Sequence, residues 1–256
     1  MKTSIGYLMP YLNNVMKYSR KNIMAYNADI DAAWEDVHSL GGAITFLAGT
    51  GEHIHAVSGS AEDDPDKGAG VAGTGAHSVK VFYLDTSGVL QSETIALNGT
   101  AAVQSTATDV AFVLGAYVVD AGTGLVAAGQ ILIKNAAETN LMEIAANQTQ
   151  TFMGAYQVPT GYRLDIVGID AASCILATGA VSLSYLRLLV SNWNETAGDL
   201  TTVDSEHFLW SVNGSRYIEL VQPLRIPADK KVRLQAYGAA ANNYVQANIE
   251  AFLVKV

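Results

Sequence analysis

The chain has 256 residues, half of them hydrophobic, which is enough to bury a substantial core without disulfide or metal cross-links. Its formal net charge of −9 at pH 7 repels phosphate backbones, so we expect no nucleic acid partner. No uninterrupted apolar stretch approaches the roughly 20 residues of a membrane helix, so we expect no membrane partner either.

The first residues carry a charge opposite to that of the rest of the chain. Residues 1–28 hold four bases and no acid, while residues 29–256 hold the other 11 bases and all 24 acids. The N-terminus lacks the apolar region and cleavage site of a secretory signal. Cys174 is the only cysteine, which excludes an internal disulfide and a cysteine-based zinc site. These features predict synthesis in a reducing cytoplasm.

Residues 1–42 are predicted to form a short helical N-terminal arm. Apolar side chains recur at loosely helical spacing from residue 8 to residue 24, and Ile30 to Val37 carry a second apolar stripe that Gly41-Gly42 can end. The arm's apolar and basic side chains are our candidates for an anchoring surface. They are Leu8, Leu12, Met16, Lys17, Arg20 and Lys21.

Beyond Gly42, short apolar runs alternate with turn-forming residues, a pattern typical of an all-β region. The expected strands are 44–48, 52–58, 77–84, 89–97, 109–119, 130–134, 150–155, 162–169, 180–190, 206–212, 216–221, 230–237 and 244–254. Because no helices lie between them, they favour an antiparallel β-sandwich or jelly-roll body.

Turn chemistry predicts several hairpins in this body. Asp85-Thr86-Ser87-Gly88 is expected to join two strands, and Asn98-Gly99 and Asn213-Gly214 are expected to close tight reversals. In the last two strands, 230–237 and 244–254, apolar and polar residues alternate. This alternation predicts a final hairpin with one core face and one solvent face.

The polar segment 135–142 is the predicted boundary between two β-sandwich regions, 43–137 and 138–256, although it can also be a long loop within one large sandwich. The stretch from Gly59 to Gly75 is rich in acids and glycines, and we expect an exposed, mobile loop there.

Several short motifs resemble functional sites without meeting their requirements. Residues 68–73 match GxGxxG but lack the strand and helix that dinucleotide binding needs. His53 and His55 share one face of a strand without a third metal ligand, and residues 63–68 have carboxylates without the register of a calcium loop. No nucleophile elbow or convergent acid pair is evident. We expect no cofactor, no metal and no catalytic residues, so the chain is predicted not to be an enzyme.

From about residue 73 onward the chain resembles tailed-bacteriophage virion proteins of the head-decoration, head-fibre and minor capsid type. The resemblance is carried by residues 73–81, 83–85, 93–103, 118–124, 158–162 and 226–230, and it covers about two thirds of the chain. It implies a β-sandwich body, often trimeric, that attaches to the capsid. Residues 1–42 show no clear match.

These observations predict a capsid-associated structural protein that forms homotrimers through its β body. Its location is then the virion, and its partner is the major capsid protein or another virion protein, contacted by the N-terminal arm. Two alternatives remain open. One is a receptor- or carbohydrate-binding fibre module that uses Trp193, and the other is a β-rich polysaccharide depolymerase.

Overall fold

The structure is a computed structural model that describes residues 18–68, 70–175, 178–180, 182–192, 203–239 and 243–256. The described residues form strands and no helix, and every strand pair is antiparallel. The predicted mainly β class is therefore confirmed. The predicted helical arm is wrong for residues 18–42, because they form two strands and connecting loops.

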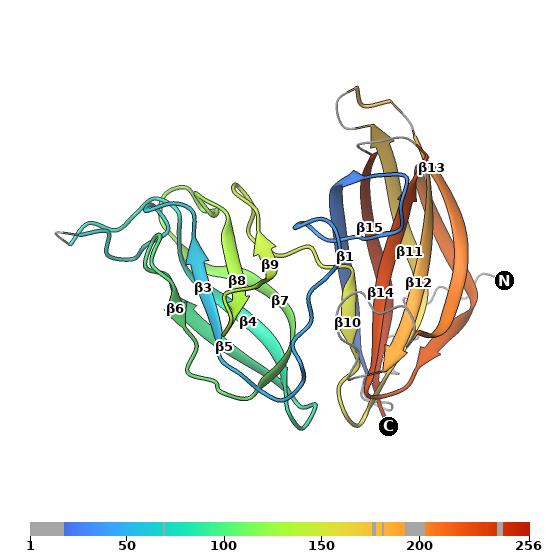
Figure 1. Cartoon of the computed structure of the whole chain (residues 1–256), viewed down its shortest axis with the longest axis horizontal. Coiled ribbons are helices and arrows are strands. Elements are labelled where there is room, and N and C mark those ends of the chain that lie inside the picture. The colour runs from blue at the N-terminus through green and yellow to red at the C-terminus, as the bar shows by residue number, and fades with distance from the viewer. Residues whose placement is uncertain (1–17, 69, 176–177, 181, 193–202, 240–242) are drawn as a thin grey trace.

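The strands form two units that lie beside each other (Figure 1). The first unit contains β3 (Ile54–Ser58), β4 (Ala76–Asp85), β5 (Leu90–Ala96), β6 (Val103–Gln104), β7 (Val110–Ala121), β8 (Ile131–Asn135) and β9 (Asn140–Ile144). The second unit contains β1 (Tyr18–Ile30), β2 (Glu35–Asp36), β10 (Ala155–Gln157), β11 (Tyr162–Ile175), β12 (Leu183–Asn192), β13 (Val203–Ile226), β14 (Lys230–Gly238) and β15 (Asn243–Lys255).

The first unit packs two small sheets against each other. One has the order β6-β3-β8-β9 and the other has the order β5-β4-β7. Their facing sides share a core of buried hydrophobic residues between Ile44 and Ala155, to which β9 contributes Leu141, Met142 and Ile144. The Asp85–Gly88 turn joins β4 to β5 as predicted, since the Asp85 carboxylate accepts backbone hydrogen bonds from Ser87 and Val89.

The second unit is one sheet that folds over into a nearly closed barrel, with the order β1-β15-β11-β13-β12-β14-β10 and with β2 beside β14. The fold-over lies in β13, which pairs with β12 up to Asn213 and with β11 from Gly214 onward. The predicted hairpin at Asn213-Gly214 is therefore wrong. Gly214 has a φ of 78°, and the strand passes through this position to bridge the two halves of the barrel.

The segment predicted as the first helix is the edge strand β1, which pairs along its length with β15. Ile23, Ala25 and Asn27 are buried in alternation with more exposed neighbours, which is the period of two that a strand requires. Ile23 and Ala25 join the second core, whose members lie between residues 23 and 37 and between residues 156 and 253. Packing against β15 therefore outweighed a loosely helical pattern.

The last two strands do not form the predicted hairpin, because β14 pairs with β12 and β10 while β15 pairs with β1 and β11. Strand β15 has the predicted core face. Strand β14 is buried on both faces, including its polar residues Lys231, Arg233 and Gln235. The reason is that the first unit and residues 34–46 cover the outer face of β14.

Candidate binding site at the seam of the barrel

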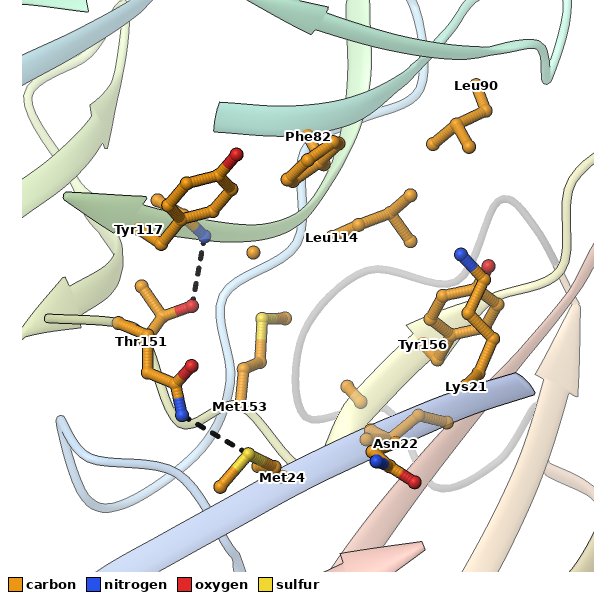
Figure 2. Close-up of a pocket in the computed structure, with 15 residues that line it drawn as sticks. Lys21, Asn22, Met24, Phe82, Leu90, Leu114, Tyr117, Thr151, Met153 and Tyr156 are labelled. Carbon is orange, nitrogen blue, oxygen red and sulfur yellow. Dashed lines mark hydrogen bonds between the residues drawn. The ribbon is translucent and has the colours of Figure 1, made fainter. Parts of the chain in front are cut away.

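The barrel of the second unit stays open between its two end strands, β1 and β10. A groove of about 330 Å³ lies along this seam and is closed on the other side by the first unit (Figure 2). Its lining comes from β1, from β4, β5 and β7, and from the segment that leads into β10. The residues are Lys21–Met24, Phe82, Leu90, Leu114–Tyr117, Gln150, Thr151, Met153, Ala155 and Tyr156.

The first unit supplies an apolar wall to the groove. The Phe82 and Tyr117 rings stack with centroids 5.7 Å apart and an interplanar angle of 28°. Leu90 and Leu114 extend this wall, as Figure 2 shows. Because such surfaces are costly to expose to water, the wall favours ligands with an apolar part.

The segment before β10 is held against both units by side-chain hydrogen bonds. The Thr151 hydroxyl accepts a hydrogen bond of 3.0 Å from the Ala116 backbone N–H, and the Gln150 Nε2 donates to the Met24 sulfur at 3.2 Å. Figure 2 shows both contacts at one end of the groove. They fix the width of the groove, because they connect β7 to β1 through a single segment.

Three polar side chains line the groove from the strands of the second unit, Lys21 and Asn22 of β1 and Tyr156 of β10. Lys21 lies in register with Ala251, on the same side of β1 as the buried Ile23, and is itself half-buried. Burial lowers the pKa of the Lys21 ammonium. Tyr156 is only 6% exposed, and burial together with the nearby Tyr162 raises the pKa of its hydroxyl. Within the described residues this hydroxyl has no hydrogen-bond partner.

The two units are tied together next to the groove by a buried cation–π contact. The Lys231 amino group of β14 lies 4.7 Å from the centroid of Phe46 and 5.9 Å from that of Phe112, two stacked rings of the first unit's core. Gly154 adds a close backbone approach, since its N–H donates to the Val37 carbonyl and an added Cβ would lie 2.5 Å from that oxygen. Such contacts favour a fixed arrangement of the units.

A buried polar network holds β2 on the outer face of β14. The Asp36 carboxylate accepts hydrogen bonds of 2.8 Å from the Ile44 backbone N–H and from Gln235 Nε2, and it lies 3.6 Å from Arg233. Gln235 in turn accepts from Arg187, whose guanidinium lies 4.2 Å from the centroid of the Trp34 ring. The network is a structural one, because the side chains of Asp36, Gln235 and Arg187 hydrogen-bond to one another and to the backbone of Ile44.

The candidate anchoring residues fall into three groups according to where they lie. Leu8, Leu12, Met16 and Lys17 lie outside the described residues. Arg20 forms an ion pair of 2.9 Å with Glu250 on the outside of the barrel, and Lys21 lines the groove. Arg20 and Lys21 are thus parts of a sheet and do not lie on a helical arm.

The groove itself was not anticipated from the sequence, because residues 21, 82, 114 and 156 are distant along the chain. The sequence did contain one indication of the groove. Lys21 and Ile23 are separated by two positions, and in a strand this places a lysine on the core side.

The predicted exposed loop 59–75 is exposed only in part, because residues 65–68 and 70–72 are exposed while Asp63 is completely buried and Asp64 is buried as well. The Asp63 carboxylate accepts hydrogen bonds from the Ser58 hydroxyl at 2.5 Å and from three backbone N–H groups, those of Ala76, Ala128 and Gly129, at 2.6–2.9 Å. Asp63 therefore organises the loops at one end of the first unit. Its role is to satisfy buried donors.

The other motifs form ordinary contacts. His55 lies 2.6 Å from Glu138, and His53 lies 3.2 Å from the Ser105 carbonyl. Among the described residues, no group of three or more His, Cys, Asp or Glu is placed to hold a metal ion, and no helix is long and apolar enough to cross a membrane. Trp193, the candidate sugar contact, lies outside the described residues.

No protein-family model matches the chain. No curated protein matches it either. Among solved structures, the chain is weakly similar to the T=1 particles derived from infectious bursal virus, at 7% identity and a TM-score of 0.22, over 93% of this chain and 69% of that one. It is also weakly similar to the VP2 subviral particle of infectious bursal disease virus, at 8% identity and a TM-score of 0.21, over 93% and 72%. Likeness at this level carries no argument about function.

Proposed function

We propose that the chain is a non-catalytic structural component of a virus particle, one that associates with itself and with the major capsid protein. The resemblance to bacteriophage head-decoration and minor capsid proteins supports this proposal and suggests a trimer. The arrangement of the two β units supports it as well. A barrel and a two-sheet unit joined through a buried Lys231 contact make a stiff body, which is what a building block requires.

The observation that carries the proposal is the exposure of four apolar side chains on the three-stranded sheet of the first unit and its β4–β5 turn. Val89 and Leu90, in the turn and strand after β4, are 48% and 40% exposed, and Tyr117 and Val119 of β7 are 38% and 50% exposed. β5 and β7 flank β4 in one sheet. Leu90 pairs with Leu84 at one end of β4, and Val119 lies beside the Ser78–Val79 end, so the exposed apolar side chains extend along the sheet. Apolar exposure on a sheet is typical of interaction surfaces.

Self-association is tested by measuring the mass of the full chain in solution by sedimentation velocity over a range of concentrations. We expect an oligomer that Val119→Glu dissociates, because an interface core does not tolerate an unpaired charge. Val71→Glu is the matched control, since Val71 is a similarly exposed valine in the loop before β4. A wild-type chain that stays monomeric, or an oligomer unaffected by Val119→Glu, would contradict the proposed interface.

Anchoring is tested with a chain that lacks residues 1–17 and therefore the candidate anchors Leu8, Leu12, Met16 and Lys17. A longer deletion to residue 28 is unsuitable, because it removes most of β1 and with it Ile23 and Ala25 from the core. We expect the shorter chain to remain folded and to lose binding to capsid shells in co-sedimentation. Undiminished binding would show that the N-terminal segment is not the anchor.

A further inference from the structure

The seam groove contains two hydrogen-bond donors that the described residues leave without an acceptor, the half-buried Lys21 ammonium and the buried Tyr156 hydroxyl. Lys21 has no carboxylate within ion-pairing distance among the described residues, although the chain carries an excess of acids. The Tyr156 hydroxyl, more than nine-tenths buried, has no partner there either. In the view of Figure 2 both groups project to the same end of the groove, away from Thr151.

Such a pair is costly to leave without an acceptor. The buried hydroxyl loses its hydration on folding without gaining a hydrogen bond, and the half-buried ammonium loses part of its hydration without gaining a counter-ion among the described residues. An anion with acceptor oxygens would compensate both, since charge-assisted hydrogen bonds are the stronger kind. A carboxylate has two acceptor oxygens, one for the Lys21 ammonium and one for the Tyr156 hydroxyl.

The rest of the lining restricts what the anion can carry. Leu114, Phe82 and Met153 offer apolar surface, so the remainder of the ligand should be apolar. If each heavy atom takes up roughly the ~30 Å³ that a water molecule occupies in the liquid, the groove holds about ten to eleven heavy atoms. An eight-carbon monocarboxylate has that size.

We propose that the groove between β1 and β10 binds a medium-chain aliphatic carboxylate, whose headgroup contacts Lys21 and Tyr156 and whose chain lies against Leu114, Phe82 and Met153. The ligand bridges the open seam of the barrel and the wall of the first unit. Binding should therefore strengthen the junction between the two units. The proposal is independent of the virion role.

The test is a calorimetric titration of the full chain with octanoate and, in parallel, with octanol, which has the same chain but no charge. We expect one octanoate per chain, and octanol bound at least about tenfold more weakly, as expected for the loss of a charged hydrogen bond. Lys21→Met should weaken octanoate binding by about tenfold or more and leave octanol binding unchanged. Tyr156→Phe should also weaken octanoate binding by about tenfold or more, the effect of one hydrogen bond to a charged group.

Lys255→Met is the matched control, because it removes an exposed lysine from β15, away from the groove lining. Circular dichroism of each variant verifies folding, and Lys21→Gln provides a second replacement. Absent octanoate binding, equal binding of octanol and octanoate, or wild-type affinity in both Lys21 variants would overturn the proposal. The same titration is carried out with an N-acetylated apolar tripeptide that has a free C-terminal carboxylate. If the tripeptide binds more tightly than octanoate, the groove recognises a peptide C-terminus and the proposal of an aliphatic carboxylate is wrong.

Discussion

The Lys231 amino group lies 4.7 Å above the Phe46 ring, so that a charge on β14 of the barrel rests on the aromatic core of the neighbouring unit. Both residues are buried. A lysine in such a place is stabilised by the ring quadrupole and by the packing of its methylene groups. The contact explains why a strand whose sequence alternates between polar and apolar residues is buried on both faces.

This contact is expected to couple the stabilities of the two units. A double-mutant cycle with Phe46→Leu and Lys231→Met should give an interaction free energy of about 0.5–2 kcal/mol, the range of cation–π pairs. The free energies of unfolding are measured by urea denaturation of the four proteins. Strictly additive effects would mean that the two side chains are neighbours without energetic coupling.

The Asp36 carboxylate is expected to be essential for the packing of β2 against β14. Asp36→Ala removes the acceptor for Ile44 and Gln235 and leaves Arg233 without its nearby carboxylate. We expect the free energy of unfolding to fall by about 3–5 kcal/mol, as for other broken buried pairs. Asp29→Ala, in the exposed part of the same region, should change it by less than about 0.5 kcal/mol. Equal effects of the two substitutions would count against a network role.

The Asp63 carboxylate should be equally important for the first unit. In Asp63→Asn, an amide NH₂ replaces an oxygen that accepts hydrogen bonds, so at least one backbone donor among Ala76, Ala128 and Gly129 loses its partner. Since each unsatisfied buried donor costs about 1–3 kcal/mol, we expect a destabilisation of at least about 1 kcal/mol. Thermal unfolding would measure it. Asp66→Asn serves as the control for the exposed part of the loop and should leave the melting temperature nearly unchanged.

His38 is expected to make the junction sensitive to mild acid. Burial lowers the pKa of its imidazole despite the opposing effect of Asp36, and within the described residues its Nε2 has no partner. Because the unfolded chain then binds a proton more readily than the folded chain, stability should decrease as the pH falls below the unfolded value of about 6.5. Well above pH 6.5, His38 is neutral in both the folded and the unfolded chain, and its destabilising contribution is absent.

The pH effect is measured by urea denaturation at pH 8 and pH 5.5. His38→Gln should reduce the difference in unfolding free energy between the two pH values. His53→Gln, which alters a histidine of the first unit whose Nδ1 lies 3.2 Å from the Ser105 carbonyl, should retain it. A wild-type slope in His38→Gln would assign the acid sensitivity to other groups.

Local patterns in the sequence were sufficient for the class of the fold and for several of its parts. The alternation in β15 identified its buried face, and the Asp85–Gly88 turn identified the β4–β5 hairpin. In these cases each residue's environment depends on its immediate neighbours, through the pleat of a strand or the geometry of a turn. The antiparallel β class follows from such signals alone.

Only the tertiary structure decided the rest. Whether residues 18–30 become a helix or a strand depends on the free edge of β15, more than 200 residues away, and the same edge turns Lys21 toward the groove. The continuity of β13 through Gly214 and the burial of Lys231 likewise depend on partners from other parts of the chain. Pairing and burial at these positions are set by long-range contacts. A local sequence pattern does not indicate which distant segment will pack against it.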